Sequence, residues 1–166
     1  MRKTLEILSL SALALQCLIT GSALYGGARL PDKIPTHFNA AGQPDAWGSA
    51  HTLLVFPLIA AVLYTLMTVV ARFPSAFNFP VRVTPRNRAQ LEALALGMIA
   101  WLKSELMYSF AWIEWEAIRT AHHPDTGFSP YPMPLLLATV FATIAAYVAS
   151  MFRAARKPMT GSNAQT

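Results

Sequence analysis

The sequence has few charged residues and a single cysteine. Asp, Glu, Lys and Arg make up 13% of its 166 residues, whereas 54% of the residues are hydrophobic. Soluble domains typically contain about 25% charged residues. So few charges cannot cover so much apolar surface in water, which excludes a soluble globular domain and a disordered chain. The single cysteine, Cys17, excludes an intramolecular disulfide and with it a disulfide-stapled secreted domain.

Catalytic motifs are missing as well. The sequence contains no HExxH, GxSxG, CxxC, Walker A or GxGxxG motif, each of which ties a chemistry to a fixed spacing. Glu114 and Glu116 are two residues apart on a predicted helix, so they do not face each other as an acid–base pair. We therefore expect a protein that is not an enzyme and needs no cofactor.

Apolar runs long enough to cross a bilayer are abundant. The hydrocarbon core is about 30 Å thick, and a helix needs about 20 residues to cross it. The runs cover residues 5–25, 52–71, 90–113 and 133–152. The first is longer than the apolar core of about 7–15 residues in a signal peptide, so we expect a retained span, with a cleaved signal as the alternative.

The third run differs from the others because it carries Glu92, Lys103 and Glu105. Lys103 and Glu105 near its centre would cost about 5–7 kcal/mol on an insertion scale. This segment therefore needs neighbouring helices that accept the two side chains, or a tilted and partly hydrated position.

The distribution of basic residues favours four spans with both termini in the cytoplasm. Nine basic residues then lie inside: Arg2, Lys3, Arg72, Arg82, Arg86, Arg88, Arg153, Arg156 and Lys157. Three lie outside: Arg29, Lys33 and Arg119. This excess follows the positive-inside rule, and it explains the net charge of +5 without a nucleic-acid partner. We predict an all-α integral membrane protein, a single membrane domain over 1–166 with four transmembrane helices in a bacterial cytoplasmic membrane.

The loop at 28–50, after the first span, is predicted to be ordered and extracytoplasmic. Its prolines restrict the backbone on both sides of each ring. If Ile34–Asn39 is extended, His37 and Asn39 face one side while Ile34, Thr36 and Phe38 face the other. The polar side, followed by Asp45 and Trp47, is then a candidate ligand surface. The alternative is that these polar side chains only hydrogen-bond the loop backbone.

The same loop resembles a known family. Residues 30–49 read LPDKIPTHFNAAGQPDAWGS, which is similar to the signature LPxxIPxHFNxxGxxDxWGS of bacterial membrane proteins related to SdpI, a domain of unknown function. Ala50 stands where that family usually has lysine. The segments around Phe77–Val81, Trp101–Lys103 and Ile113–Trp115 also resemble short members of this family.

The resemblance implies a non-catalytic immunity-type protein that protects or signals. Its partners would be the lipid bilayer, together with a peptide toxin or a membrane or regulatory protein. A homo-oligomer is left open by the sequence.

A second group of candidate ligand-binding residues lies on the third span. Trp101, Glu105, Tyr108 and Trp112 recur at three- and four-residue steps and so share one helix face. Glu105 is a candidate for a cation or a ligand amine, with aromatic rings beside it. This favours, as an alternative function, a small ion-coupled transporter that uses Glu105, for example as a dimer. The structural alternative is that Glu105 and Lys103 bond to polar groups on neighbouring helices, or that Lys103 snorkels.

The four histidines fall on the predicted outer side. His37, His51, His122 and His123 have carboxylates nearby in sequence, but their spacing matches no known zinc site. We therefore predict no metal site, and a metal-dependent outer-face enzyme is the last alternative.

Overall fold

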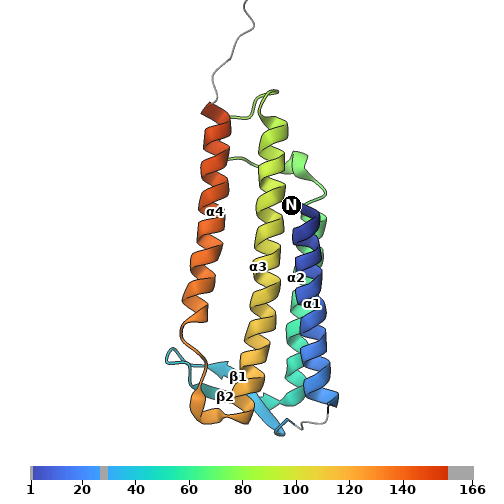
Figure 1. The fold of residues 1–166 in the computed structure, drawn as a ribbon, viewed down its shortest axis with the longest axis vertical. Coiled ribbons are helices and arrows are strands. Elements are labelled where there is room, and N and C mark those ends of the chain that lie inside the picture. Colours follow the sequence, from blue (N-terminus) through green and yellow to red (C-terminus); the bar gives the residue numbers. More distant parts are fainter. Residues whose placement is uncertain (1, 27–29, 157–166) are drawn as a thin grey trace, which may run out of the picture.

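Four α-helices and one β-hairpin make up the described part of the chain, residues 2–26 and 30–156 of a computed structural model (Figure 1). The elements are α1 (Arg2–Tyr25), β1 (Lys33–Phe38), β2 (Pro44–Ser49), α2 (Val55–Val70), α3 (Arg88–His122) and α4 (Pro132–Arg156). A 3₁₀ turn, Ala50–Leu54, leads into α2. Residues 28–29 of the predicted loop, including Arg29, and Lys157 lie outside the described residues.

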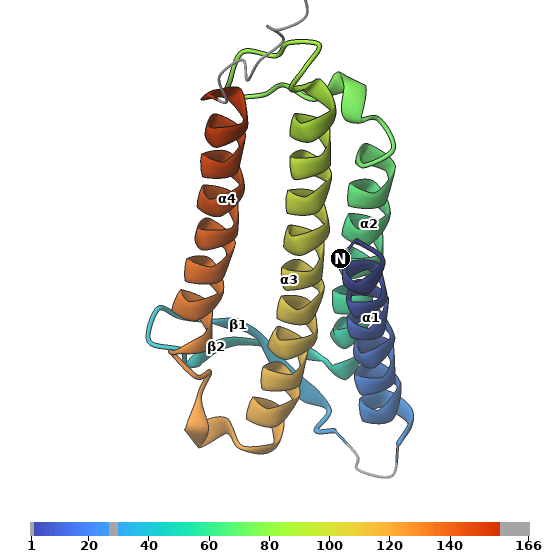
Figure 2. The same ribbon diagram turned by 45° about the horizontal axis from the view of Figure 1, so that its top comes forward.

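The helix α3 forms the centre of the molecule. It lies between α4 on one side and the pair α1 and α2 on the other (Figures 1 and 2). Successive helices run in opposite directions, so that α1 and α3 are parallel. The hairpin closes the end of the bundle at which α1 and α3 finish.

Three helices are long and apolar enough to cross a membrane: Arg2–Tyr25, Ala50–Val70 and Pro132–Arg156. Few residues in the most apolar 18-residue stretch of each helix are buried inside the protein: 22% in the first, 11% in the second and 6% in the third. Apolar helix faces of this size are stable when lipid covers them. The structure is thus mostly helical and suggests a membrane environment.

Buried apolar side chains form three small clusters along α3 rather than one large core. The clusters are Leu91, Ala95, Met151 and Ala154; Ala12, Ala60 and Met107; and Ile34, Leu53 and Ala121. The first joins α3 to α4, the second joins α3 to α1 and α2, and the third joins α3 to β1 and the 3₁₀ turn. The other three helices, β1 and the 3₁₀ turn therefore all pack against α3.

The helix α3 is longer than the predicted span at 90–113. Its 35 residues end at His122, which corresponds to a length of about 52 Å. The apolar pattern ends near Ile113 because Glu114, Glu116 and Thr120 follow it, yet all three are buried in the structure. The helix continues because these polar side chains find partners inside the protein, which an apolar pattern does not reveal.

One β-hairpin lies in the loop of this mostly helical chain, where the sequence predicted no strand pair. The segment expected to be extended does form β1, but it pairs with β2, and the pairing register shifts on both sides of His37. A shift in register changes which side chains share a face. Ile34 is buried, whereas Thr36, expected on the same side, is exposed.

Candidate functional site

A cavity of about 580 Å³ lies beneath the hairpin, at the end of the bundle where α3 finishes. The hairpin supplies its wall from Pro35 to Gly42, and Phe56 of α2 with Ile113 of α3 supply its floor. Phe128 and Ser129 close it from the loop that precedes α4. We call this cavity the outer pocket. Its volume falls within the range of about 300–1,000 Å³ that is usual for small-molecule sites.

The hairpin turn is fastened to the loop before α4. The Phe128 amide donates to the Gly42 carbonyl at 2.6 Å, and the Phe38 and Phe128 rings lie 5.0 Å apart. Gly42 has φ of +76°, a left-handed conformation that favours glycine. An added Cβ at Gly42 would lie 2.7 Å from the Phe128 carbonyl oxygen. Only glycine therefore allows this approach.

The loop is fastened in turn to α3. Arg119 Nη2 donates to the Gly127 carbonyl at 2.8 Å and to Glu116 Oε2 at 2.6 Å. Glu116 Oε2 also accepts from the Ser129 amide at 3.3 Å. Glu116 is 3% exposed, so this carboxylate is neutralised inside the protein by a paired guanidinium. The loop that closes the outer pocket is thus held by the ion pair between Arg119 and the buried Glu116 of α3.

Two predicted ligand residues, His37 and Asn39, line the outer pocket. His37 Nδ1 lies 2.5 Å from Asp45 Oδ1, and both side chains are largely accessible, 69% and 42% exposed. Asn39 Oδ1 accepts from the Ala41 and Gln43 amides at 2.9 and 3.0 Å. The loop-capping alternative therefore describes Asn39, whereas His37 and Asp45 bond to each other.

Trp47 does not belong to this pocket. It lies on β2 opposite Pro35 and is 44% exposed. Asp45 does not line the pocket either, but it bonds to His37, which does. Sequence reasoning grouped these residues because they share one loop, but the register shifts in the hairpin send them to different places.

Glu105 and Tyr108 line a second cavity, on the stretch of α3 that precedes Ile113 of the outer pocket. This cavity, the inner cleft, has a volume of about 370 Å³ and lies where α3 meets α1 and α4. Trp101 and Trp112 line it too, so the predicted aromatic face does gather around Glu105. Glu105 Oε1 accepts from Thr143 of α4 at 2.6 Å, and Tyr108 Oη lies 3.2 Å from Ser11 Oγ of α1.

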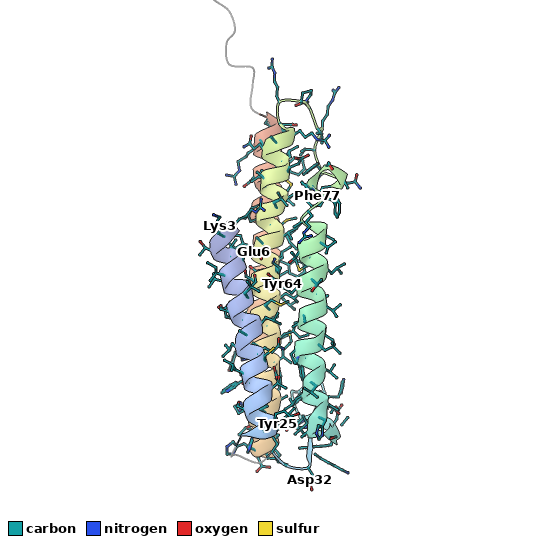
Figure 3. All side chains as sticks on the ribbon, turned by 90° about the vertical axis from the view of Figure 1, so that its right-hand side faces the viewer. Lys3, Glu6, Tyr25, Asp32, Tyr64 and Phe77 are labelled. Carbon is teal, nitrogen blue, oxygen red and sulfur yellow. The ribbon has the colours of Figure 1, made fainter. Side chains whose placement is uncertain are left out.

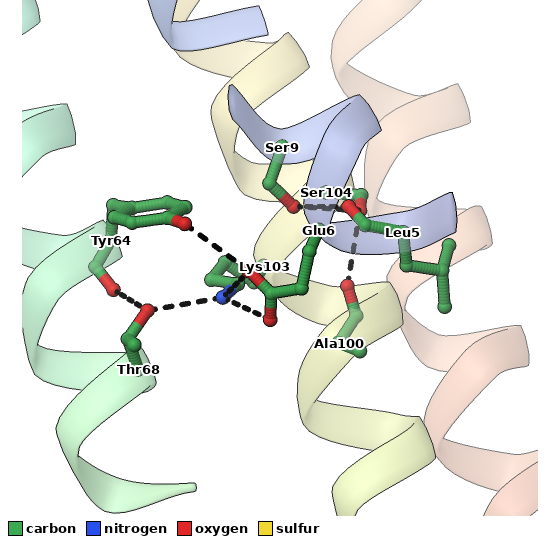
Figure 4. Close-up of polar contacts among 8 residues, drawn as sticks. All are labelled: Leu5, Glu6, Ser9, Tyr64, Thr68, Ala100, Lys103 and Ser104. Carbon is green, nitrogen blue, oxygen red and sulfur yellow. Dashed lines mark hydrogen bonds and ion pairs between the residues drawn. The ribbon is translucent and has the colours of Figure 1, made fainter. Parts of the chain in front are cut away.

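Lys103, on another side of α3, forms an ion pair with Glu6 of α1. Its Nζ donates to the two carboxylate oxygens at 2.6 and 2.7 Å and to Thr68 of α2 at 3.0 Å (Figure 4). The ammonium also lies 4.4 Å from the centre of the Tyr64 ring. Figure 3 shows Glu6 and Tyr64 at one level between α1 and α2. Lys103 is 1% exposed and therefore does not snorkel.

A third carboxylate of α3 also faces α1. Glu114 Oε1 accepts from Thr20 Oγ1, and both residues are buried. Nearer the start of α1, Ser9 Oγ lies 2.9 Å from Ser104 Oγ, and Ser104 also donates to the Leu5 carbonyl (Figure 4). Lys103, Ser104 and Glu114 of α3 thus contact α1, whereas Glu105 contacts α4. Sequence reasoning did not pair Glu6 or Thr20 with α3, although Glu6 is the one charge in an otherwise apolar run.

No group of three or more His, Cys, Asp or Glu side chains is placed to hold a metal ion among residues 2–26 and 30–156. The histidines expected on one side of the membrane do occur at one end of the bundle, in the hairpin segment and at the end of α3.

Comparison with known proteins matches one segment of the chain to a family but indicates no activity. Residues 12–61 match a domain of unknown function, DUF1648; this segment runs from α1 through the hairpin into α2. An uncharacterized protein from Archaeoglobus fulgidus is 31% identical over 84 residues, which cover 46% of this chain and 43% of the relative. The similarity thus extends over less than half of the relative's length. No solved structure matches the chain.

Proposed function

We propose that the protein crosses a bacterial cytoplasmic membrane four times, with α3 as the third span and both termini in the cytoplasm. The alternating directions of the four helices support this topology (Figure 1). The α2–α3 loop and the end of α4, which carry Arg82 and Arg153, lie together at the end of the bundle opposite the hairpin. An excess of basic residues there fits a cytoplasmic face.

The contacts of α3 support its position in the membrane. Lys103 is paired with Glu6, Glu116 is paired with Arg119, and Glu105 and Glu114 each accept a threonine hydroxyl. Ionisable side chains in a membrane are stabilised when they face the bundle interior and pair there. The low hydropathy of α3 is therefore compatible with a span that three other helices shield.

A topology prediction follows for the hairpin. In a Cys17→Ser background, Ala46→Cys on β2 is expected to react with a membrane-impermeant maleimide in intact cells, because the hairpin lies outside. The matched control Ser75→Cys lies in the α2–α3 loop and is expected to react only after lysis. Both positions are exposed. Labelling of Ser75→Cys but not Ala46→Cys in intact cells would reverse the proposed orientation.

The proposed activity is binding, without catalysis, of an extracytoplasmic ligand in the outer pocket, for protection or signalling. The observation that carries this proposal is the pocket itself, whose aromatic and aliphatic walls meet a polar rim of His37, Asn39 and Ser129. Pockets with mostly apolar walls and a few placed polar groups are typical of ligand sites. No hydrogen bond joins His37 to a hydroxyl or thiol of the described residues that could serve as a nucleophile. Its resemblance to SdpI-type immunity proteins suggests a membrane-active peptide as the ligand.

A blocking substitution tests this activity. Ala40 lines the outer pocket and is exposed, so Ala40→Trp is expected to fill it, whereas Ala46→Trp on β2 leaves it open. We expect the wild-type protein and Ala46→Trp to raise the lethal dose of at least one secreted membrane-active peptide in a sensitive host at least tenfold. Ala40→Trp is expected to lose that protection.

The measurement is a survival curve for each peptide at matched expression. Identical curves for wild-type and empty-vector cells across the panel would reject protection. Protection retained by Ala40→Trp would show that the outer pocket is not the binding site.

A carrier that uses Glu105 is the second candidate function. It is favoured by one observation, that Glu105 Oε2 is buried without a hydrogen-bond partner among the described residues. Uptake of a coupled ion into reconstituted vesicles that Glu105→Gln leaves unchanged would contradict this alternative.

A further inference from the structure

The inner cleft contains a carboxylate whose charge the described residues do not balance. Lysine or arginine side chains among these residues pair with Glu6, Glu92 and Glu116; Glu105 is in none of these pairs. Glu105 Oε1 accepts one hydrogen bond from Thr143, and Oε2 is buried without a partner. A carboxylate oxygen left in this way in an apolar cavity favours a cation beside it.

The residues that line the cleft indicate which kind of cation fits there. Trp101, Tyr108 and Trp112 line the cavity around Glu105, and α4 adds Leu135 and Leu136. Aromatic faces attract organic ammonium groups, most strongly where water is excluded. A small metal ion would instead need several oxygen ligands, and the described residues offer no such cluster of acidic or histidine side chains here. The lining thus fits an ammonium group attached to an apolar chain.

The position of the cleft indicates how such a molecule would reach it. The cleft is bounded by Leu8 of α1 and by α4, two helices that face each other across α3 rather than packing together. Most of the apolar surface of α4 is exposed, so the cleft opens sideways, toward the surface that lipid would cover. A ligand from the bilayer could enter there without passing through the outer pocket.

We propose that the inner cleft binds a lipophilic amine from the bilayer, with its ammonium group on Glu105 Oε2 and its chain along α4. This proposal rests on the membrane position of α3 but not on ligand binding in the outer pocket. Thr143 holds Oε1, and Oε2, which is buried without a partner among the described residues, would turn into the cleft to meet the ammonium group. Binding is noncovalent and reversible, and the ligand is released chemically unchanged.

Purified full-length protein in a non-ionic detergent allows a direct test. Dodecylamine is titrated at fixed detergent concentration, and tryptophan fluorescence is recorded because Trp101 and Trp112 line the cleft. Dodecanol, with the same chain and no charge, is the matched ligand. We expect dodecylamine to bind at least tenfold more tightly than dodecanol.

Variants separate the carboxylate from the apolar walls. Glu105→Gln keeps the acceptor for Thr143 and is expected to weaken dodecylamine binding at least tenfold, while dodecanol binding stays unchanged. Glu92→Gln, on the same helix but paired with Arg88 outside the cleft, is the control and is expected to bind like wild type. Trp101→Leu is expected to weaken dodecylamine binding several-fold with the carboxylate intact.

Two results would overturn the proposal. One is equal affinity for dodecylamine and dodecanol, which would mean that the cleft holds only an apolar chain. The other is unchanged dodecylamine affinity in Glu105→Gln, which would mean that the carboxylate does not hold the ammonium group. Because the assay uses neither toxin nor cells, its failure would leave the outer pocket proposal standing, and failure of the survival assay would leave this one standing.

Discussion

Replacing Glu6 with leucine is expected to lower the free energy of unfolding by about 3 kcal/mol. Among the described residues, the substitution leaves the Lys103 ammonium, 1% exposed, with only Thr68 and the Tyr64 ring as partners. Removing one member of a buried ion pair typically costs about 3–5 kcal/mol, because the other charge stays uncompensated. We expect a loss at the low end of this range because the Glu6 side chain is 42% exposed, which weakens its interaction with Lys103. Unfolding by SDS titration or heating in a mild detergent measures the change.

Replacing the other member of the ion pair, Lys103, provides the control. Lys103→Leu leaves the Glu6 carboxylate, 42% exposed at the start of α1, with the Tyr64 hydroxyl as a donor, so a smaller loss of about 1 kcal/mol is expected. The double variant Glu6→Leu with Lys103→Leu is expected to be more stable than Glu6→Leu alone, since no buried charge remains. Equal losses in the two single variants, or no recovery in the double variant, would contradict the asymmetry that the structure implies.

Replacing Gly42 with alanine is expected to release the hairpin from the loop before α4. The left-handed conformation costs a residue with a Cβ about 1–2 kcal/mol. The new methyl group would also lie 2.7 Å from the Phe128 carbonyl oxygen, a separation that forces the two backbones apart. The hydrogen bond from the Phe128 amide to the Gly42 carbonyl would then lengthen or break. Amide hydrogen exchange of residues 33–49 is expected to accelerate at least tenfold, whereas exchange in the middle of α3 stays the same.

Gly21→Ala is the matched control. A Cβ at Gly21 would have no heavy atom within 4 Å, and alanine favours a helix over glycine by about 0.5–1 kcal/mol. This variant is therefore expected to keep slow exchange in the hairpin. Slow hairpin exchange in Gly42→Ala as well would show that the turn does not depend on contact with Phe128.

A contact between two rings links the lining of the outer pocket to that of the inner cleft. Phe128 lines the pocket, Trp112 lines the cleft, and their ring centres are 4.9 Å apart in an edge-on contact. A substitution at either ring would change both cavities at once. For that reason the proposed variants Ala40→Trp and Glu105→Gln avoid both residues, and each cavity is tested by itself.

Composition and periodicity alone predicted the apolar helices and the face of α3 that carries Glu105. These features are local, since an apolar run of about 20 residues has one stable environment and a three- and four-residue spacing fixes a helix face. The extended segment before Asn39 was predicted for a similar reason, because prolines restrict the backbone near them. By length and apolar composition three helices could cross a membrane. The helix α3 is not among them because its charged side chains lower its hydropathy.

Only the tertiary structure decided which polar side chains meet. Glu6 is 97 residues from Lys103, and Thr143 is 38 residues from Glu105, so no spacing rule links them. The hairpin register was likewise undetermined, since one shift beside His37 separates it from Trp47. Contacts over such distances depend on how helices and strands pack, and that packing is set by the whole chain rather than by any short segment.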